Sequence, residues 1–169
     1  LTGSTGFLGK VFLEKLLWEQ PGVRKVFLII PPRGGRCAQT RLQHEILDTQ
    51  LFNRLREKHG TGFEPFIERR LFAVDGDLGI EGLGLSQENE SEIINEAEVF
   101  VNSAATTTLN ERFDTAVNIN TLGPRRLLHL SRKCQNVVLI CHVSTAFVNG
   151  LRRGPVAERA FKIGDCISQ

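Results

Sequence analysis

The sequence predicts an α/β fold in which helices cover both faces of a parallel sheet, the doubly wound arrangement. Short, continuous apolar runs alternate along the chain with longer stretches whose apolar residues recur every three or four positions. Such runs suit strands that are buried on both faces of a parallel sheet, and the alternation implies crossover helices. The chain has 169 residues, 41% of them hydrophobic, which is enough for one domain with its own core.

The chain opens with the end of a strand, a glycine-rich turn and a helix. We interpret Leu1–Thr2 as the last residues of the strand and residues 3–9 as the turn. Apolar residues at i, i+3 and i+4 over residues 8–17 predict the helix, which ends before Pro21. The continuous apolar run at 26–30 predicts the next strand, buried on both faces.

The middle of the chain carries two helical patterns around a third strand. Residues 41–59 have the periodicity of one amphipathic helix, whereas residues 60–70 give no clear signal. The apolar run at 71–74 predicts the strand. Ser86 is a good N-cap residue, so the following helix is expected to begin there and to run to about residue 96.

The last part of the chain repeats the alternation. Residues 99–102 and 137–143 predict the fourth and fifth strands, and residues 115–134 predict the long helix between them. Residue 1 is Leu rather than Met, and almost no strand precedes the glycine turn. We therefore expect residues 1–169 to be a partial domain, truncated at both ends.

Composition narrows the classes of partner. The formal net charge is only +2 and the basic residues are spread along the chain, which disfavours a nucleic-acid surface. The four cysteines show neither C-x-x-C pairing nor metal-ligand spacing, which favours reduced thiols in an intracellular compartment and no metal site. No apolar run reaches the length that a transmembrane segment needs. A small-molecule partner is expected.

The glycine-rich turn is the first motif with a chemical meaning. Gly3, Gly6 and Gly9 lie between a strand end and a helix start, where glycines let backbone amides approach a pyrophosphate at the helix N-terminus. Their spacing differs from G-x-G-x-x-G and resembles the T-G-x-x-G-x-x-G turn of extended short-chain dehydrogenases/reductases, a Rossmann-type group. The alternative is a turn that serves only helix–strand packing.

The second motif concerns the choice between NADH and NADPH. An NAD site usually carries an acidic residue about 20 positions after the first glycine, but residues 29–31 contain none. Arg33 and Arg36 follow instead, and guanidinium groups pair well with a 2′-phosphate. The sequence therefore favours NADPH, with a solvated basic loop as the alternative.

Two further segments follow predicted strands. Residues 76–78 come after the third strand and residues 103–106 after the fourth, and open α/β sheets bind ligands at the carboxyl ends of their strands. Small residues at 103–105 would let a cofactor lie against the backbone.

Taken together, these segments resemble the male-sterility type of fatty acyl reductases, especially those of plants. The matching stretches are Thr2–Lys10, Val101–Thr107, Asn110–Asp114, Ile119–Gly123 and His142–Gly150. Their order and spacing also agree, and the resemblance covers nearly the whole chain. It implies the reduction of long-chain fatty acyl thioesters, carried on coenzyme A or on acyl carrier protein, to fatty alcohols with NADPH.

The resemblance also implies roles for individual residues. The pyrophosphate would lie on the turn, the adenine on the segment after the third strand, and the rest of the cofactor along the segment after the fourth. The residues concerned are, in that order, Thr2, Gly3, Thr5, Gly6, Phe7, Leu8 and Gly9, then Asp77 and Leu78, then Ala104, Ala105 and Thr106, with Asn120 as support from its helix.

The hydroxyl that hydrogen-bonds the substrate carbonyl in this family matches Thr145, with Ser144 as the alternative. Such a donor suits hydride addition, which builds negative charge on that oxygen. The family also uses a Tyr-x-x-x-Lys pair some tens of residues later as the proton donor. This chain contains no tyrosine, so we expect it to be catalytically incomplete. A second departure is Pro31, where the family usually has a basic residue.

Two other readings remain open. The chain could belong to another extended short-chain enzyme, such as a sugar epimerase or the reductase domain of a carboxylic acid reductase, although residues 41–59 and the segment Ala104–Thr107 favour the acyl family. Alternatively, it could serve only as a nucleotide-binding module. The resemblance makes the surface of the endoplasmic reticulum or a plastid plausible as its location.

Overall fold

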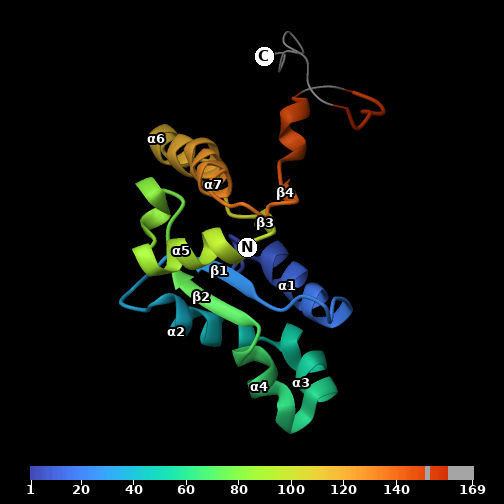
Figure 1. Cartoon of the computed structure of the whole chain (residues 1–169). Coiled ribbons are helices and arrows are strands. Elements are labelled where there is room, and N and C mark those ends of the chain that lie inside the picture. The colour runs from blue at the N-terminus through green and yellow to red at the C-terminus, as the bar shows by residue number, and fades with distance from the viewer. Residues whose placement is uncertain (151–152, 160–169) are drawn as a thin grey trace.

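A parallel sheet of four strands forms the centre of the molecule (Figure 1). The computed structural model describes residues 1–150 and 153–159. The strands are β1 (Val26–Ile30), β2 (Leu71–Asp75), β3 (Val99–Asn102) and β4 (Leu139–His142). β1 pairs with β2 and β3 pairs with β4, and both pairs are parallel. Each strand coincides with or overlaps an apolar run from which the sequence predicts it, and β2 extends one residue further, to Asp75.

Thr2 joins the two pairs into one sheet. It forms parallel bridges to Ile29 of β1 and to Asn102 of β3. Its amide donates to the carbonyl oxygen of Val101 at 3.0 Å, and the amide of Ile29 donates to the carbonyl oxygen of Leu1 at 3.0 Å. The spatial order is therefore β2, β1, the opening segment, β3 and β4. The chain winds outward from its first segment in both directions, which confirms the doubly wound α/β fold.

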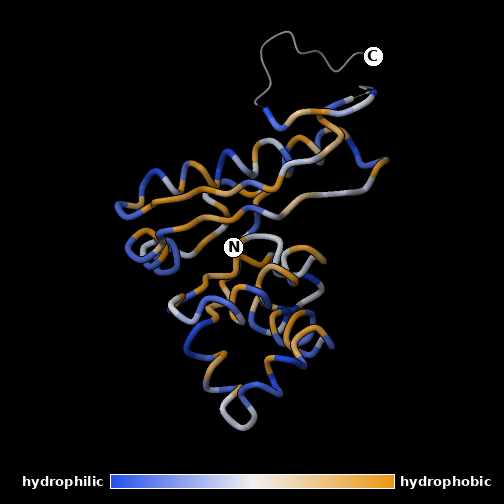
Figure 2. The backbone as a smooth tube through the Cα atoms, turned by 90° about the vertical axis from the view of Figure 1, so that its right-hand side faces the viewer, coloured by the Kyte–Doolittle hydropathy of each residue, from blue (hydrophilic) through white to orange (hydrophobic). Residues whose placement is uncertain are grey.

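Helices cover both faces of this sheet and bury two apolar clusters. On β1, Val26, Leu28 and Ile30 enter one cluster, whereas Phe27 and Ile29 enter the other, so all five residues are buried. Helices of the first cluster are α1 (Phe7–Glu19), α2 (Ala38–Leu42), α3 (Asn53–His59) and α4 (Phe63–Glu68); those of the second are α5 (Gln87–Glu96) and α7 (Gly123–Ser131). Hydrophobic stretches run along the strands, and hydrophilic residues occupy many outer turns (Figure 2).

The amphipathic stretch at residues 41–59 is a series of short helical pieces, so the prediction of one helix is wrong. α2 continues into a π-helical turn, η1 (Gln43–Leu47), and a 3₁₀ turn, η2 (Gln50–Phe52), precedes α3. The break lies at Thr49, where the backbone is extended and the hydroxyl donates to the carbonyl oxygen of Ile46 at 2.6 Å. Periodicity located the buried positions correctly, because each piece still turns its apolar residues toward the first cluster.

The helices predicted before β1, after β2 and after β3 lie close to their predicted positions, whereas residues 60–70, for which no element was predicted, are largely helical. Ser86 caps α5, since its Oγ accepts a hydrogen bond from the amide of Asn89 at 3.2 Å. The long helix after β3 consists of α6 (Phe113–Val117), the π-helical turn η5 (Asn118–Leu122) and α7, and the segment before β2 contains η3 (Gly60–Gly62) and α4. No helix in the described part of the chain has both the length and the apolar character needed to cross a membrane.

A cavity of about 540 Å³ lies toward the amino ends of the strands. Its lining includes Val26 and Phe27 of β1 and Val99 and Phe100 of β3. The nitrogen of Leu1 donates to the carbonyl oxygen of Phe27 at 2.8 Å. The segments that follow the strands lie at the other edge of the sheet.

His59 makes the stability of the α3–α4 region sensitive to pH. Its ring stacks on Phe66 with 3.9 Å between centroids, and its Nε2 is buried without a partner among the described residues. Desolvation, with smaller effects from Lys58 and Arg70, lowers the pKa of His59 below its ordinary value of 6.5. Between these two pKa values the unfolded chain binds the proton more readily than the folded chain does.

We therefore expect the free energy of unfolding to be highest above pH 6.5 and to fall as the pH drops toward the pKa of folded His59. The His59→Phe variant keeps an aromatic ring against Phe66 but cannot titrate. Urea unfolding of both chains between about pH 8 and pH 5 should show a smaller decline for the variant. Parallel declines in the two chains would contradict this assignment.

Candidate functional site

The predicted site residues come together at one edge of the sheet. In a parallel sheet all carboxyl ends lie at the same edge, so the segments after the opening strand, β1, β2, β3 and β4 are neighbours. These segments are residues 3–9, 33–36, 76–79, 103–106 and 144–145. The winding reverses at Leu1–Thr2, between β1 and β3, which is where open α/β sheets place their ligands.

The three glycines of the turn meet different surroundings. Gly3 has φ +72°, and a Cβ there would lie 2.6 Å from the backbone of Ser103 and Ala104. A Cβ on Gly9 would overlap the carbonyl group of Gly3, so this glycine lets α1 pack against the turn. A Cβ on Gly6 would meet only the carbonyl oxygen of Gly3, at 3.3 Å. Gly3 and Gly9 are therefore required by the fold, whereas the side of Gly6 is open.

The N-terminus of α1 offers free donors at this open side. Gly6 is the N-cap, without a side-chain cap, and the first turn carries no acidic residue. Within the described residues the amides of Phe7 and Leu8 donate to no acceptor, and both side chains are exposed. Thr5 is half-buried, and its hydroxyl makes no hydrogen bond in the described part of the chain. Free amides and the positive end of a 13-residue helix suit an anion such as a pyrophosphate.

Thr2 supports the turn from inside the protein, and its side chain does not face the open side at Gly6. Its side chain is buried, and its hydroxyl donates to Oδ1 of Asn102 at 2.6 Å. The Thr2 hydroxyl oxygen also accepts a hydrogen bond from the amide of Ala104 at 3.3 Å. The other end of the Asn102 amide lies 3.0 Å from Nδ1 of His142. This chain of contacts ties the carboxyl ends of the opening strand, β3 and β4 together.

Arg33 and Arg36 flank a tight hairpin directly after β1. Each donates its amide to the carbonyl oxygen of the other at 3.0 Å. Gly34 and Gly35 form the turn with φ of +58° and +74°, which only glycine adopts readily. Residues paired in this way carry their side chains on the same face. Both arginines are exposed, and neither forms an ion pair among the described residues, so the hairpin presents two guanidinium groups together.

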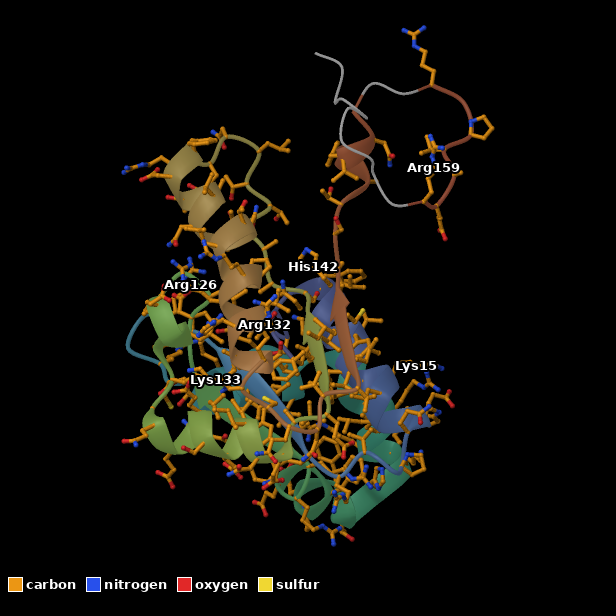
Figure 3. All side chains as sticks on the ribbon, turned by 45° about the horizontal axis from the view of Figure 1, so that its top comes forward. Lys15, Arg126, Arg132, Lys133, His142 and Arg159 are labelled. Atoms are coloured by element: carbon orange, nitrogen blue, oxygen red, sulfur yellow. The ribbon has the colours of Figure 1, made fainter. Side chains whose placement is uncertain are left out.

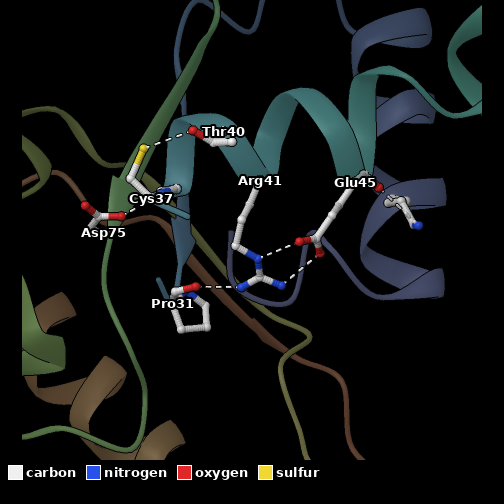
Figure 4. Close-up of polar contacts among 8 residues, drawn as sticks. Pro31, Cys37, Thr40, Arg41, Glu45 and Asp75 are labelled. Atoms are coloured by element: carbon white, nitrogen blue, oxygen red, sulfur yellow. Dashed lines mark hydrogen bonds and ion pairs between the residues drawn. The ribbon is translucent and has the colours of Figure 1, made fainter. Parts of the chain in front are cut away.

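Partly buried polar contacts hold both ends of this hairpin (Figure 4). The Arg41 side chain is 7% exposed, and it donates to the carbonyl oxygen of Pro31 at 2.5 Å and to both carboxylate oxygens of Glu45 at 2.7 and 2.8 Å. Hydrogen bonds and charge from Arg41 lower the pKa of Glu45. On the other side, Asp75 accepts from the amide of Ala38 at 2.6 Å. The carbonyl group of Pro31 thus anchors the start of the hairpin through Arg41.

The segment after β2 faces the site mainly with its backbone. Oδ1 of Asp77 accepts from the amide of Gly79 at 2.7 Å, and the amide of Asp77 donates to the carbonyl oxygen of Leu83 in the 3₁₀ turn η4 (Glu81–Gly84). The side chain of Leu78 is buried in the second apolar cluster, 6% exposed, and packs against Gly123. Leu78 can therefore offer backbone atoms to a ligand, but its side chain belongs to the core.

The segment after β3 is held by Asn120 of η5. The amide of Thr106 donates to Oδ1 of Asn120 at 2.9 Å, and Nδ2 of Asn120 donates back to the carbonyl oxygen of Thr106 at 3.0 Å. The Thr106 hydroxyl donates to Glu111 at 3.2 Å, which leaves Ala104 and Ala105 as the small surface of this segment. Asn120 therefore fixes the backbone that the sequence predicts to line a cofactor.

Thr145 is exposed just beyond β4. Its Oγ1 accepts from the amide of Phe147 at 3.3 Å and so caps a short 3₁₀ turn, η6 (Ala146–Asn149). This bond uses a lone pair of the hydroxyl and leaves its hydrogen free to donate. Ser144 is also exposed, and its hydroxyl makes no hydrogen bond among the described residues. Thr145 is the better oriented of the two donors, because the cap fixes its position.

Several supporting residues could not be identified from the sequence. They are Asn102, His142, Arg41, Asp75, Asn118 and Arg126, and each contacts a residue that is 10 to 100 positions away in the sequence. The only local signal is a polar residue at the end of an apolar run, as at Asn102, Asp75 and His142.

Comparisons with known proteins agree with the architecture of this edge. The model of the NAD-binding family described as "Male sterility protein" matches residues 1–166. "Fatty acyl-CoA reductase 2, chloroplastic" of Arabidopsis thaliana is 45% identical over 99% of this chain and 27% of its own length. "Alcohol-forming fatty acyl-CoA reductase" of Simmondsia chinensis is 36% identical over 99% of the chain and 34% of its own length. The chain thus spans about a quarter to a third of these relatives.

Solved structures show the same fold at lower identity. The terminal R domain from the myxalamid PKS-NRPS biosynthetic pathway superposes with a TM-score of 0.73 and 24% identity, over 95% of this chain and 38% of that one. The reductase domain of a nonribosomal peptide synthetase from Mycobacterium tuberculosis gives a TM-score of 0.63 and 22% identity, over 88% of this chain and 33% of that one. The fold and the family match lead to one conclusion: the chain belongs to the male sterility protein family of NAD-binding domains.

Proposed function

We propose that the carboxyl edge of the sheet binds NADPH, and that residues 1–169 form part of its binding domain. The pyrophosphate lies on the turn at Gly6 and on the free amides of α1, and the 2′-phosphate lies between Arg33 and Arg36. The observation that carries the proposal is the reciprocally bonded hairpin that presents both guanidinium groups together beside the glycine turn. Adenine then lies over the backbone at Asp77–Leu78, and the nicotinamide half extends along residues 104–106.

We further propose that the parent enzyme reduces long-chain fatty acyl thioesters to fatty alcohols. The two relatives named above are both called fatty acyl-CoA reductases, which supports this substrate class and favours coenzyme A over acyl carrier protein as the carrier. The chloroplastic relative favours a plastid as the location. Bound NADPH would supply the hydride. Thr145 would donate its free hydroxyl hydrogen to the carbonyl oxygen as negative charge builds there.

Removal of either hairpin arginine is expected to weaken NADPH binding selectively. A charge-assisted hydrogen bond contributes about 1.5–3 kcal/mol, so Arg33→Ala and Arg36→Ala should each raise the Kd for NADPH by about tenfold or more. The Kd for NADH should stay nearly constant, because NADH lacks the 2′-phosphate. Calorimetric titration of both cofactors gives these values. Arg125→Ala, an exposed arginine on α7, is the matched control.

The outcome that contradicts the assignment is equal affinity of the wild-type chain for NADPH and NADH. Unchanged NADPH affinity in the double variant Arg33→Ala/Arg36→Ala would contradict it as well. In either case the hairpin would be a solvated basic loop, and the 2′-phosphate would need another partner.

A further inference from the structure

The π-helical turn η5 carries two asparagines that reach two different loops of the site. Nδ2 of Asn118 donates to the carbonyl oxygen of Gly79 at 2.9 Å, in the segment after β2. Asn120 binds the backbone of Thr106, in the segment after β3, through two hydrogen bonds. Residues two apart on a helix do not share a face, so one helical turn can contact loops on both of its sides. Turns with π geometry often occur at functional sites.

Arg126 strengthens the contact with the first of these loops. Its Nη1 donates to the carbonyl oxygen of Leu78 at 2.9 Å and to that of Asn118 at 3.1 Å, and its Nε lies 3.2 Å from Glu81. The Arg126 side chain is 15% exposed and lies between the long helix and the segment after β2 (Figure 3). The carbonyl oxygens of two successive loop residues, Leu78 and Gly79, therefore bind side chains of the long helix.

A hydrogen bond within the loop at residues 77–79 also restrains its backbone. Oδ1 of Asp77 accepts from the amide of Gly79 at 2.7 Å. A Cβ on Gly79 would lie 3.2 Å from Nδ2 of Asn118 and 3.2 Å from Oδ1 of Asp77, so the glycine fits between the two side chains. Contacts within the chain itself thus fix the backbone of this loop.

The order of the strands assigns the two loops to different parts of a dinucleotide. The loop at 77–79 follows β2, on the side of the arginine hairpin, whereas Thr106 follows β3, on the side of β4 and Thr145. A 2′-phosphate at the hairpin places the adenosine half on the β1–β2 side and the nicotinamide half on the β3–β4 side.

We infer that Asn118, together with Arg126, is a positioning residue for the adenosine half of the cofactor. Asn120, two residues later, positions the loop for the other half. This inference rests on the proposed function, since it takes the ligand to be NADPH. It predicts that replacing Asn118 and replacing Asn120 have different effects on the binding of a ligand with only the adenosine half and of one with both halves of the cofactor.

The first test is calorimetric titration of the 169-residue chain with 2′,5′-ADP and with NADPH. Asn118→Ala should raise the Kd for both ligands by a similar factor, about tenfold, because both contain the adenosine half. Asn120→Ala should raise the Kd for NADPH by a similar factor and leave the Kd for 2′,5′-ADP within about twofold of the wild-type value. Each variant serves as the control for the other. Equal losses for both ligands in both variants would overturn the inference.

The second test needs no ligand and follows amide hydrogen exchange by NMR. Asn118→Ala should speed exchange at Gly79 and Ile80, whose amides donate to Asp77 within the loop, and should leave Thr106 unchanged. Asn120→Ala should speed exchange at Thr106, whose amide it frees, and leave Gly79 and Ile80 unchanged. Acceleration throughout the chain in both variants would overturn the inference. A wild-type chain with this pattern that binds neither nucleotide would refute the proposed function but retain the two separate loop anchors.

Discussion

Replacing Gly6 with valine is expected to abolish dinucleotide binding while the chain stays folded. Gly6 has φ −77° and ψ 168°, an extended conformation that a β-branched residue adopts without strain. A Cβ there would lie 3.3 Å from the carbonyl oxygen of Gly3 and meet nothing else within 4 Å, so a shift of a few tenths of an ångström accommodates it. The added methyl groups would instead fill the open side, where a phosphate must approach the free amides of Phe7 and Leu8. We expect the Kd for NADPH to rise by about 100-fold or more.

The other end of the turn provides the matched comparison. Gly9→Ala puts a Cβ into the carbonyl group of Gly3 and should reduce the free energy of unfolding strongly, because backbone atoms cannot move aside. Circular dichroism and urea unfolding, measured beside the calorimetric Kd, separate the two effects. If Gly6→Val kept its affinity for NADPH in a folded chain, the turn would serve helix packing only.

The fold followed from the sequence where one local pattern determined one element. The run at 26–30 predicted a strand buried on both faces, and its residues do divide between two clusters. The stretch at 41–59 was different. Its periodicity shows which side of the helix is buried, but it does not show where the helix is interrupted. The Thr49 hydroxyl, bonded to the carbonyl oxygen of Ile46, ends the helix there through a local competition that periodicity does not reveal.

The candidate site likewise contains residues that local sequence signals identify and residues that only contacts distant in sequence reveal. Gly3 and Gly6 could be found from spacing, and Arg33 and Arg36 from the absence of an acidic residue, because each signal lies within a few positions. The sequence does not reveal that Gly34 and Gly35 turn both arginines to one face. Asn120 was expected to support the site from its helix, but the other contacts that hold the loops were beyond prediction. They join residues separated by 39 positions between Asn118 and Gly79, and by 100 positions between Thr2 and Asn102.

The 169-residue chain alone is expected to reduce a long-chain acyl-CoA at no more than the background rate, even with NADPH bound. Hydride addition leaves an oxyanion that must be stabilised and then protonated. Thr145 can supply one hydrogen bond, but a neutral hydroxyl is a poor acid, and the chain contains no tyrosine that a lysine could activate. The loss of a general acid typically costs about 10²–10⁴-fold in rate.

Loss of NADPH absorbance in the presence of a long-chain acyl-CoA measures this rate. The comparison is a longer chain that continues with the corresponding part of the 45% identical Arabidopsis relative. Comparable turnover by the two chains would mean that another group in these 169 residues protonates the product. His142 would be examined first, because it is exposed and lies two residues before Ser144. Its Nδ1 lies 3.0 Å from Nδ2 of Asn102 and accepts that hydrogen bond, so Nε2 is the ring nitrogen that can carry the proton. In that case His142→Gln should abolish turnover in the short chain, whereas Thr145→Ala should only reduce it.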